Sequence, residues 1–220
     1  MNISYVKREI SNLKEELLEI LQKYYNNEYI TENDEIEIKK KILNSYKRYL
    51  KICVCLDKKV PDYNNGIWPY QNNCYCYSLD FRKPKIFQDI YTEIFYKFFS
   101  INLGEISEVN LPRMFTEKDF FNSLYADLDF LKIKHYESSF DKDTIHGGYK
   151  IAIYMRDTKD YYKPDYHFVR QNSNGLWSEK YGSNEKIYVI NNLDHLSNHP
   201  NYRYIKTLEL VKPCLKELSL

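Results

Sequence analysis

The chain has 220 residues, of which 43% are hydrophobic and 29% charged, a balance that excludes an intrinsically disordered protein. Its 32 basic and 31 acidic side chains nearly cancel, so we expect no overall attraction to nucleic acid or to an acidic membrane surface. Five cysteines, an odd number, do not suggest a disulfide framework, and we expect free thiols in a reducing compartment.

The beginning of the chain carries no sign of targeting. Residues Met1 to Glu9 lack the apolar run of a secretory signal, and no stretch approaches the roughly 18 uninterrupted apolar residues of a membrane span. We therefore expect a cytoplasmic protein with no membrane partner, unless another system exports it.

Two amphipathic helices are predicted for residues 1–56. Apolar residues recur at steps of three and four between Val6 and Tyr24, with Lys and Glu between them. The segment Thr31-Glu32-Asn33-Asp34 resembles a capping box, and a second apolar stripe runs from Ile38 to Ile52. We interpret this segment as a helical hairpin that packs on the rest of the chain, with a protein partner at its stripe as the alternative.

A loop punctuated by proline and glycine separates this hairpin from a second domain, residues 57–220. Hydrophobic patterning predicts helices in the first part of that domain and short strands in the second, an order that indicates an α+β domain with an antiparallel sheet. Three helices are predicted in this part. The first begins near Cys74, the second spans Ile86 to Phe99, and the third runs from a cap at Thr116 to about Leu128. The predicted strands are Leu131 to Tyr136, Gly148 to Met155, Tyr166 to Gln171, Leu176 to Lys180, Lys186 to Ile190 and Arg203 to Leu208.

Cys74 is the candidate nucleophile. It follows Gln71-Asn72-Asn73 at the predicted start of a helix, where unpaired backbone N–H groups and the helix dipole favour a thiolate. The same N–H groups, with a side-chain amide from Gln71 or a neighbouring asparagine, would hold an oxyanion.

A nucleophilic cysteine also needs a base, and the chain has five histidines. His167 begins a predicted β-hairpin, and a histidine on such a rigid element is well placed to face a helix N-terminus. His195 and His199 lie among Asn and Pro residues, in a segment that we interpret as a solvated polar loop.

Two motifs carry a resemblance to a known family: N-C-Y-x-Y at residues 73–77, and D-x-H-F-x-R followed by G-x-W-S within residues 165–178. They resemble motifs of papain-like cysteine hydrolases, particularly bacterial and phage proteins. The resemblance covers roughly Trp68 to Ile190 and implies a papain-like core with the catalytic Cys on a helix and the catalytic His on the following sheet. It selects Cys74 and His167 for these roles.

The chain departs from the family motifs at two positions. Cys76 replaces a small residue, and it projects away from Cys74 on a helical wheel, so only one of the two thiols would line a cleft. Glu179 replaces a histidine that follows Trp-Ser. A carboxylate can orient an imidazole, so Glu179 is the candidate third catalytic residue. The alternatives for that role are Asp165, Asn191, Asn192 and Asp194.

The turn of the hairpin decides whether His167 and Glu179 can meet. A two-residue turn at Asn174-Gly175 would place the two side chains on opposite faces of the sheet. A three-residue turn that starts at Ser173 and ends with a left-handed Gly175 would place them on the same face. The sequence leaves both registers open.

These observations predict a thiol hydrolase or acyl-transferring enzyme in which Cys74 attacks a carbonyl carbon and His167 activates the thiol. We expect a peptide, isopeptide or acyl substrate and no metal or organic cofactor. One alternative is a catalytically degenerate papain-like scaffold that binds a protein through its helical hairpin. Another is a four-thiolate metal site, which the sequence favours less because the spacing is C-x-C rather than C-x2-C. Its cysteines would be Cys53, Cys55, Cys74 and Cys76.

Overall fold

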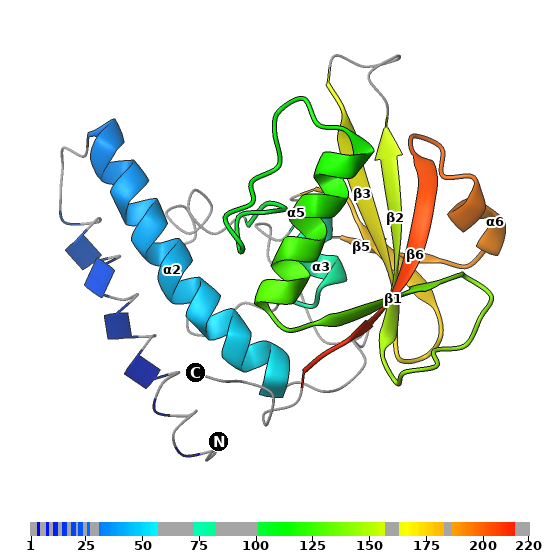
Figure 1. Ribbon diagram of the computed structural model, residues 1–220, viewed down its shortest axis with the longest axis horizontal. Coiled ribbons are helices and arrows are strands. Elements are labelled where there is room, and N and C mark those ends of the chain that lie inside the picture. Colours follow the sequence, from blue (N-terminus) through cyan, green and yellow to red (C-terminus); the bar gives the residue numbers. More distant parts are fainter. Residues whose placement is uncertain are drawn as a thin grey trace.

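The computed structural model describes residues 31–56, 73–81, 101–156, 163–182 and 186–213, together with scattered positions between 4 and 26. The helices in this described part are α2 (Glu32–Leu56), α3 (Cys74–Ser78), α5 (Glu117–Phe130) and α6 (Leu193–Ser197). Figure 1 shows α2, α3 and α5 on one side of a sheet and α6 on the other side. None of the described helices combines the length and apolar character needed to cross a membrane.

The sheet has six strands in the order β1-β6-β2-β3-β4-β5, and every neighbouring pair is antiparallel. The predicted α+β class is therefore confirmed, and each of the six predicted strands overlaps an observed one. The strands are β1 (Lys134–Ser138), β2 (Tyr149–Arg156), β3 (Asp165–Gln171), β4 (Trp177–Lys180), β5 (Ile187–Ile190) and β6 (Arg203–Val211).

Side-chain caps fix where the helices begin. The Thr31 hydroxyl accepts a hydrogen bond from the Asp34 backbone N–H at 3.2 Å, and α2 starts at the next residue after this cap. Thr116 and Asp119 form the corresponding reciprocal box before α5. The side chain of Asn73 accepts from the Cys76 N–H at 2.9 Å and caps the short helix α3.

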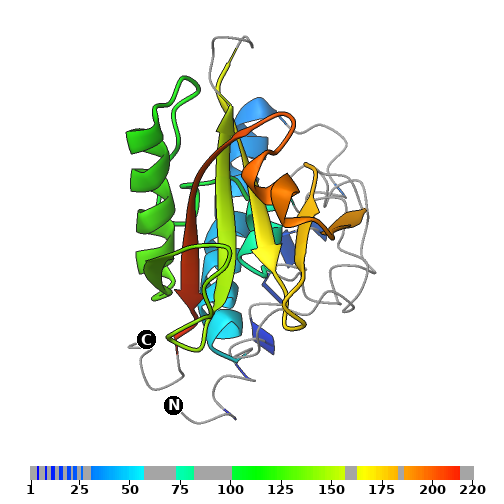
Figure 2. The ribbon, with the colours of Figure 1, turned by 90° about the vertical axis from the view of Figure 1, so that its right-hand side faces the viewer.

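Alternation along the strands gives the sheet two different faces. On β3, Phe168 points to the main core, where it packs with Tyr75 of α3 and Phe120 of α5. Val169 points to the other face and joins a smaller core with Trp177 of β4 and Leu196 of α6. Figure 2, turned by 90°, shows α5 and α6 on opposite sides of the sheet.

Arg170 fastens α3 to the sheet. Its side chain is completely buried on β3, and Nη1 donates to the carbonyl of Tyr77 at 2.8 Å and to Asp80 Oδ1 at 3.2 Å. The second oxygen of Asp80 accepts from Lys212 at 3.0 Å. Because solvent hardly reaches these charged side chains, each depends on its oppositely charged partner to offset the free-energy cost of burying its charge.

Several sequence predictions fall outside the described residues. Most of the first predicted helix, from Val6 to Tyr24, and all of the helix from Ile86 to Phe99 belong to this category. The helical hairpin and the boundary after residue 56 therefore stay predictions. The described end of α2 does contribute to the main core, through Leu50, Ile52 and Val54.

Candidate metal and acid–base site

The turn between β3 and β4 has the three-residue form. Asn172 donates from its backbone N–H to the Leu176 carbonyl at 2.8 Å, and residues 173–175 form the loop between them. Gly175 has φ of 81°, the left-handed conformation that such a loop needs. Val169 then lies opposite Glu179, so Glu179 and His167 point to the same face of the sheet.

His167 and Glu179 form a buried pair on this face. His167 Nε2 lies 2.9 Å from Glu179 Oε2, and the two side chains are 3% and 4% exposed. Burial and hydrogen bonding therefore both restrict their geometry.

Two further histidines approach the same carboxylate from helix α6 and the residues around it, residues 191–202, which we call the α6 segment. His199 Nε2 lies 3.3 Å from Glu179 Oε2 with its side chain fully buried, and His195 Nε2 lies 3.6 Å from Oε1 with its side chain 35% exposed. The prediction of a solvated loop is wrong for His199, which is buried, and the loop assignment is also wrong for His195, which lies in helix α6 with its side chain 35% exposed. The physical reason is a tertiary contact: Leu196 fills the smaller core, and its carbonyl accepts from the Tyr154 hydroxyl at 2.9 Å, which docks the segment on the sheet.

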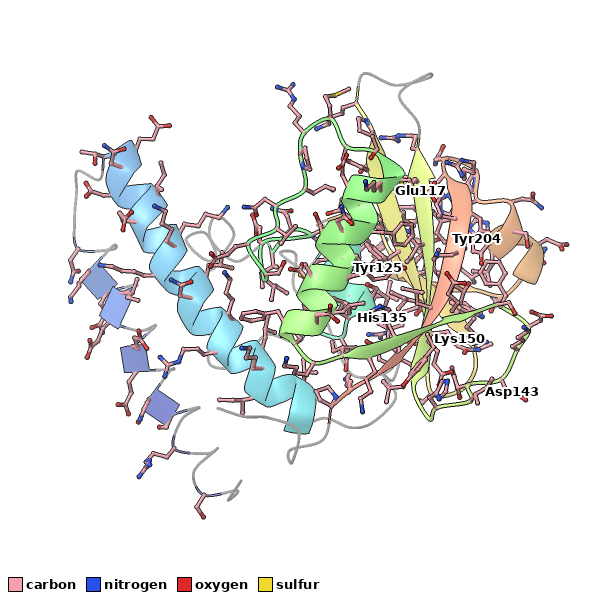
Figure 3. All side chains as sticks on the ribbon, viewed as in Figure 1. Glu117, Tyr125, His135, Asp143, Lys150 and Tyr204 are labelled. Carbon is pink, nitrogen blue, oxygen red and sulfur yellow. The ribbon has the colours of Figure 1, made fainter. Side chains whose placement is uncertain are left out.

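Tyrosines hold these groups in place. Tyr181 donates to Glu179 Oε1 at 2.8 Å, and its ring stacks on the His167 ring with centroids 5.0 Å apart. The His167 ring also stacks on the Tyr202 ring, with centroids 5.5 Å apart. Figure 3 labels Tyr204, on the same side of the sheet as α6, and Tyr125, which belongs to α5 on the other side.

The protonation states follow from burial and hydrogen bonding. Burial lowers the pKa of His167 below its usual value, although the Glu179 carboxylate opposes this. Burial alone would raise the pKa of Glu179, but the hydrogen bonds from His167 and His199 together hold it below its usual range. We infer a neutral imidazole at His167 that donates to an ionised carboxylate at Glu179.

Cys74 lies in a different environment. It belongs to the main core with Phe168, on the face of the sheet opposite His167. Burial raises the pKa of its thiol to about 12, and the backbone N–H groups of Phe168 and Tyr75 offset only part of this effect. The thiol of Cys76 is also buried, and its Sγ lies 3.4 Å from the Ile101 carbonyl.

Of the three predicted catalytic residues that the structure describes, it thus brings together two, His167 and Glu179. No hydrogen bond joins Cys74 to His167 within the described part of the chain, because alternation sends His167 to the face away from α3. Gln71 lies outside the described residues. Catalysis by Cys74 stays a prediction. The alternative orienting groups have other contacts: Asp165 binds Arg156 and Tyr202, and Asn192 caps α6.

The His–Glu cluster has the composition of a metal site. One ligand atom from each of His167, Glu179 and His199 lies within 4.8 Å of the others, and no comparable group occurs elsewhere among the residues that the structure describes. Two imidazoles and a carboxylate suit Zn²⁺ and similar transition metals. The side chains of Cys53 and Cys55 lie outside the described residues, so the four-thiolate alternative is not tested.

No protein-family model, curated protein or solved structure matches this chain. The resemblance to papain-like hydrolases therefore stays a prediction that depends on short motifs. One signal for the residues that sequence reasoning missed was present: His195-x3-His199 has the H-x3-H spacing of zinc ligands.

Proposed function

We propose that this protein binds a divalent transition-metal ion of the zinc class through His167, Glu179 and His199. The observation that supports this most directly is the convergence of two imidazole nitrogens and a carboxylate oxygen, from the β3–β4 hairpin and the α6 segment, on one buried point. The ion would cross-link these two parts of the fold.

The spacing of the ligand atoms suits a small tetrahedral ion. Bonds of about 2.0–2.1 Å place neighbouring ligands of such an ion about 3.3 Å apart. Glu179 Oε2 lies 2.9 Å from His167 Nε2 and 3.3 Å from His199 Nε2. These two distances are within a few tenths of an ångström of the tetrahedral spacing, and all three ligand atoms lie within 4.8 Å of one another.

The chemistry of the ligands also agrees. Metal ligation needs neutral histidine and ionised carboxylate, the charge states inferred for His167 and Glu179. The ion would replace the proton that His167 Nε2 donates to Glu179, and the remaining ring proton would lie on Nδ1. Tyr181, hydrogen-bonded to Glu179 Oε1, would orient the carboxylate from outside the ligand set. One contact opposes binding: the backbone N–H of Asn201 donates to His199 Nδ1 at 3.3 Å, and a metal on Nε2 would place a proton on Nδ1 and break this bond.

Zinc binding is tested with the full chain after removal of metal by EDTA. We expect one Zn²⁺ per chain and a rise in the melting temperature, since an ion at 100 times its Kd stabilises the folded state by about 2.7 kcal/mol. His199→Ala should abolish this rise. His146→Ala is the matched control, because His146 is exposed and stacks on Tyr136, outside the cluster. Equal melting temperatures with and without Zn²⁺ in the wild-type chain would refute the proposal, and Mg²⁺ should have no effect.

A second candidate function is the cysteine hydrolase, and one observation favours it. Cys74 begins α3, and the backbone N–H of Phe168, the residue after His167, is close enough to its sulfur to favour the ionised form. In this reaction the sulfur bonds to the carbonyl carbon of a peptide, isopeptide or acyl substrate, and the thiol proton passes to His167. His167 gives the proton to the leaving group as the C–N or C–O bond breaks, and water then hydrolyses the thioester.

Alkylation of each cysteine, followed by mass spectrometry as a function of pH, separates the two candidates. With a thiol pKa of about 12, Cys74 should label at least about 100-fold more slowly than a free thiol, and His167→Ala should not slow it further. Fast labelling of Cys74 that depends on His167 would instead support the hydrolase. Slow labelling in a chain that also fails to bind Zn²⁺ would favour the non-catalytic scaffold with a protein partner.

A further inference from the structure

His195 lies at the solvent side of the His–Glu cluster. Its Nε2 is 3.6 Å from Glu179 Oε1, and its ring centroid is 5.3 Å from that of His199. The side chain is 35% exposed, whereas those of His199 and Glu179 are 0% and 4% exposed. His195 is thus a partly exposed imidazole whose ring nitrogen already faces the carboxylate of a three-ligand group.

His195 is not one of the three residues whose ligand atoms lie within 4.8 Å of one another, so a change of side-chain rotamer would have to bring its Nε2 onto the same ion. The three other residues of the cluster are buried and packed against the tyrosines, whereas 35% of the His195 side chain is exposed, so it is the least restricted of the four. His199 lies beyond the C-cap Asn198 and so outside α6, but the chain still brings the two rings together, with centroids 5.3 Å apart.

The competing group for this position is the hydroxyl of Tyr181, which is 3.3 Å from His199 Nε2. The Tyr181 hydroxyl already donates its proton to Glu179 Oε1 at 2.8 Å, and it would have to lose that proton and this bond to ligate a metal well. An imidazole binds zinc in its neutral form and needs no such ionisation.

We propose that His195 is the fourth metal ligand and completes a closed site of three histidines and one glutamate. This inference depends on the metal site proposed above. It assigns the ion a structural role, because four protein ligands leave no open position for a reacting water. The ion would hold residues 191–202 against the β3–β4 hairpin.

The test compares Zn²⁺ affinity and Co²⁺ spectra for full-length variants stripped with EDTA. We expect His195→Ala to weaken Zn²⁺ binding about 10- to 100-fold while leaving one ion per chain, since three ligands are kept. In the wild-type chain Co²⁺ should show the strong visible absorption of a tetrahedral ion. His195→Ala should weaken this absorption, and added imidazole should restore it by filling the vacated position. Tyr181→Phe should keep the tetrahedral spectrum, and His146→Ala should match the wild type in both measurements.

The outcomes separate this inference from the proposal that supports it. If His195→Ala binds Zn²⁺ like the wild type while His167→Ala and His199→Ala do not, the three-ligand site stands and His195 is not a ligand. If Tyr181→Phe loses the tetrahedral spectrum and His195→Ala keeps it, the fourth ligand is Tyr181. If the wild-type chain itself fails to bind either metal, the proposed metal site is wrong as well.

Discussion

Replacing Glu179 by alanine should lower the free energy of unfolding of the metal-free chain by about 3 to 5 kcal/mol. The carboxylate is 4% exposed and bonds to His167 at 2.9 Å, to Tyr181 at 2.8 Å and to His199 at 3.3 Å. Its removal leaves these polar groups buried without their shared partner, and each such loss is worth about 1 to 3 kcal/mol. Urea unfolding in EDTA measures the effect.

Two matched variants show whether burial is the cause. Glu179→Gln keeps the volume and one acceptor oxygen, so it should lose less stability than the alanine variant but should still remove the stabilisation by Zn²⁺. Glu137→Ala removes a glutamate that bonds to Lys206 at 2.7 Å with its own side chain 78% exposed, and stability should change little. If Glu179→Ala unfolds at the same urea concentration as Glu137→Ala, the cluster contributes nothing to stability in the metal-free chain.

The local signals in the sequence were sufficient for the six strands and for α2, α3 and α5, but not for α6, whose sequence we interpret as a polar loop. The capping boxes at Thr31 and Thr116 use contacts within three residues, and the short strands are bounded by turn residues, so both are visible in the sequence. The strand order β1-β6-β2-β3-β4-β5 depends instead on which distant segments pair, and no local signal specifies it.

At the site, too, local features could be predicted from the sequence and tertiary contacts could not. The sequence defined two possible turns for the β3–β4 hairpin, and only the three-residue turn lets Glu179 meet His167. His199 was misjudged because its neighbours are polar, whereas its burial depends on the docking of Leu196 and Tyr154, which lie 42 residues apart. The expected approach of Cys74 to His167 depended on which sheet face α3 covers, a tertiary property that the motif does not encode.

Replacing Arg170 by methionine should also lower the free energy of unfolding, by about 3 to 5 kcal/mol. The variant keeps a long apolar side chain but removes the donors to the Tyr77 carbonyl at 2.8 Å and to Asp80 at 3.2 Å. It also removes a cation 4.0 Å from the centre of the Tyr77 ring. Lys212 keeps one bond to Asp80, so the carboxylate stays partly compensated.

The guanidinium shape, and not only its charge, should account for most of this loss. Arg170→Lys keeps the charge but has no planar fork to reach Tyr77, Asp80 and Asn172 together, so it should recover only a minor part of the stability. Because Arg170 fastens α3, loss of this contact should also speed alkylation of Cys74, the first residue of α3, which is buried in the main core. Full stability in Arg170→Lys would show that the charge near Asp80 is sufficient, and unchanged alkylation in Arg170→Met would show that other contacts hold α3 on the sheet.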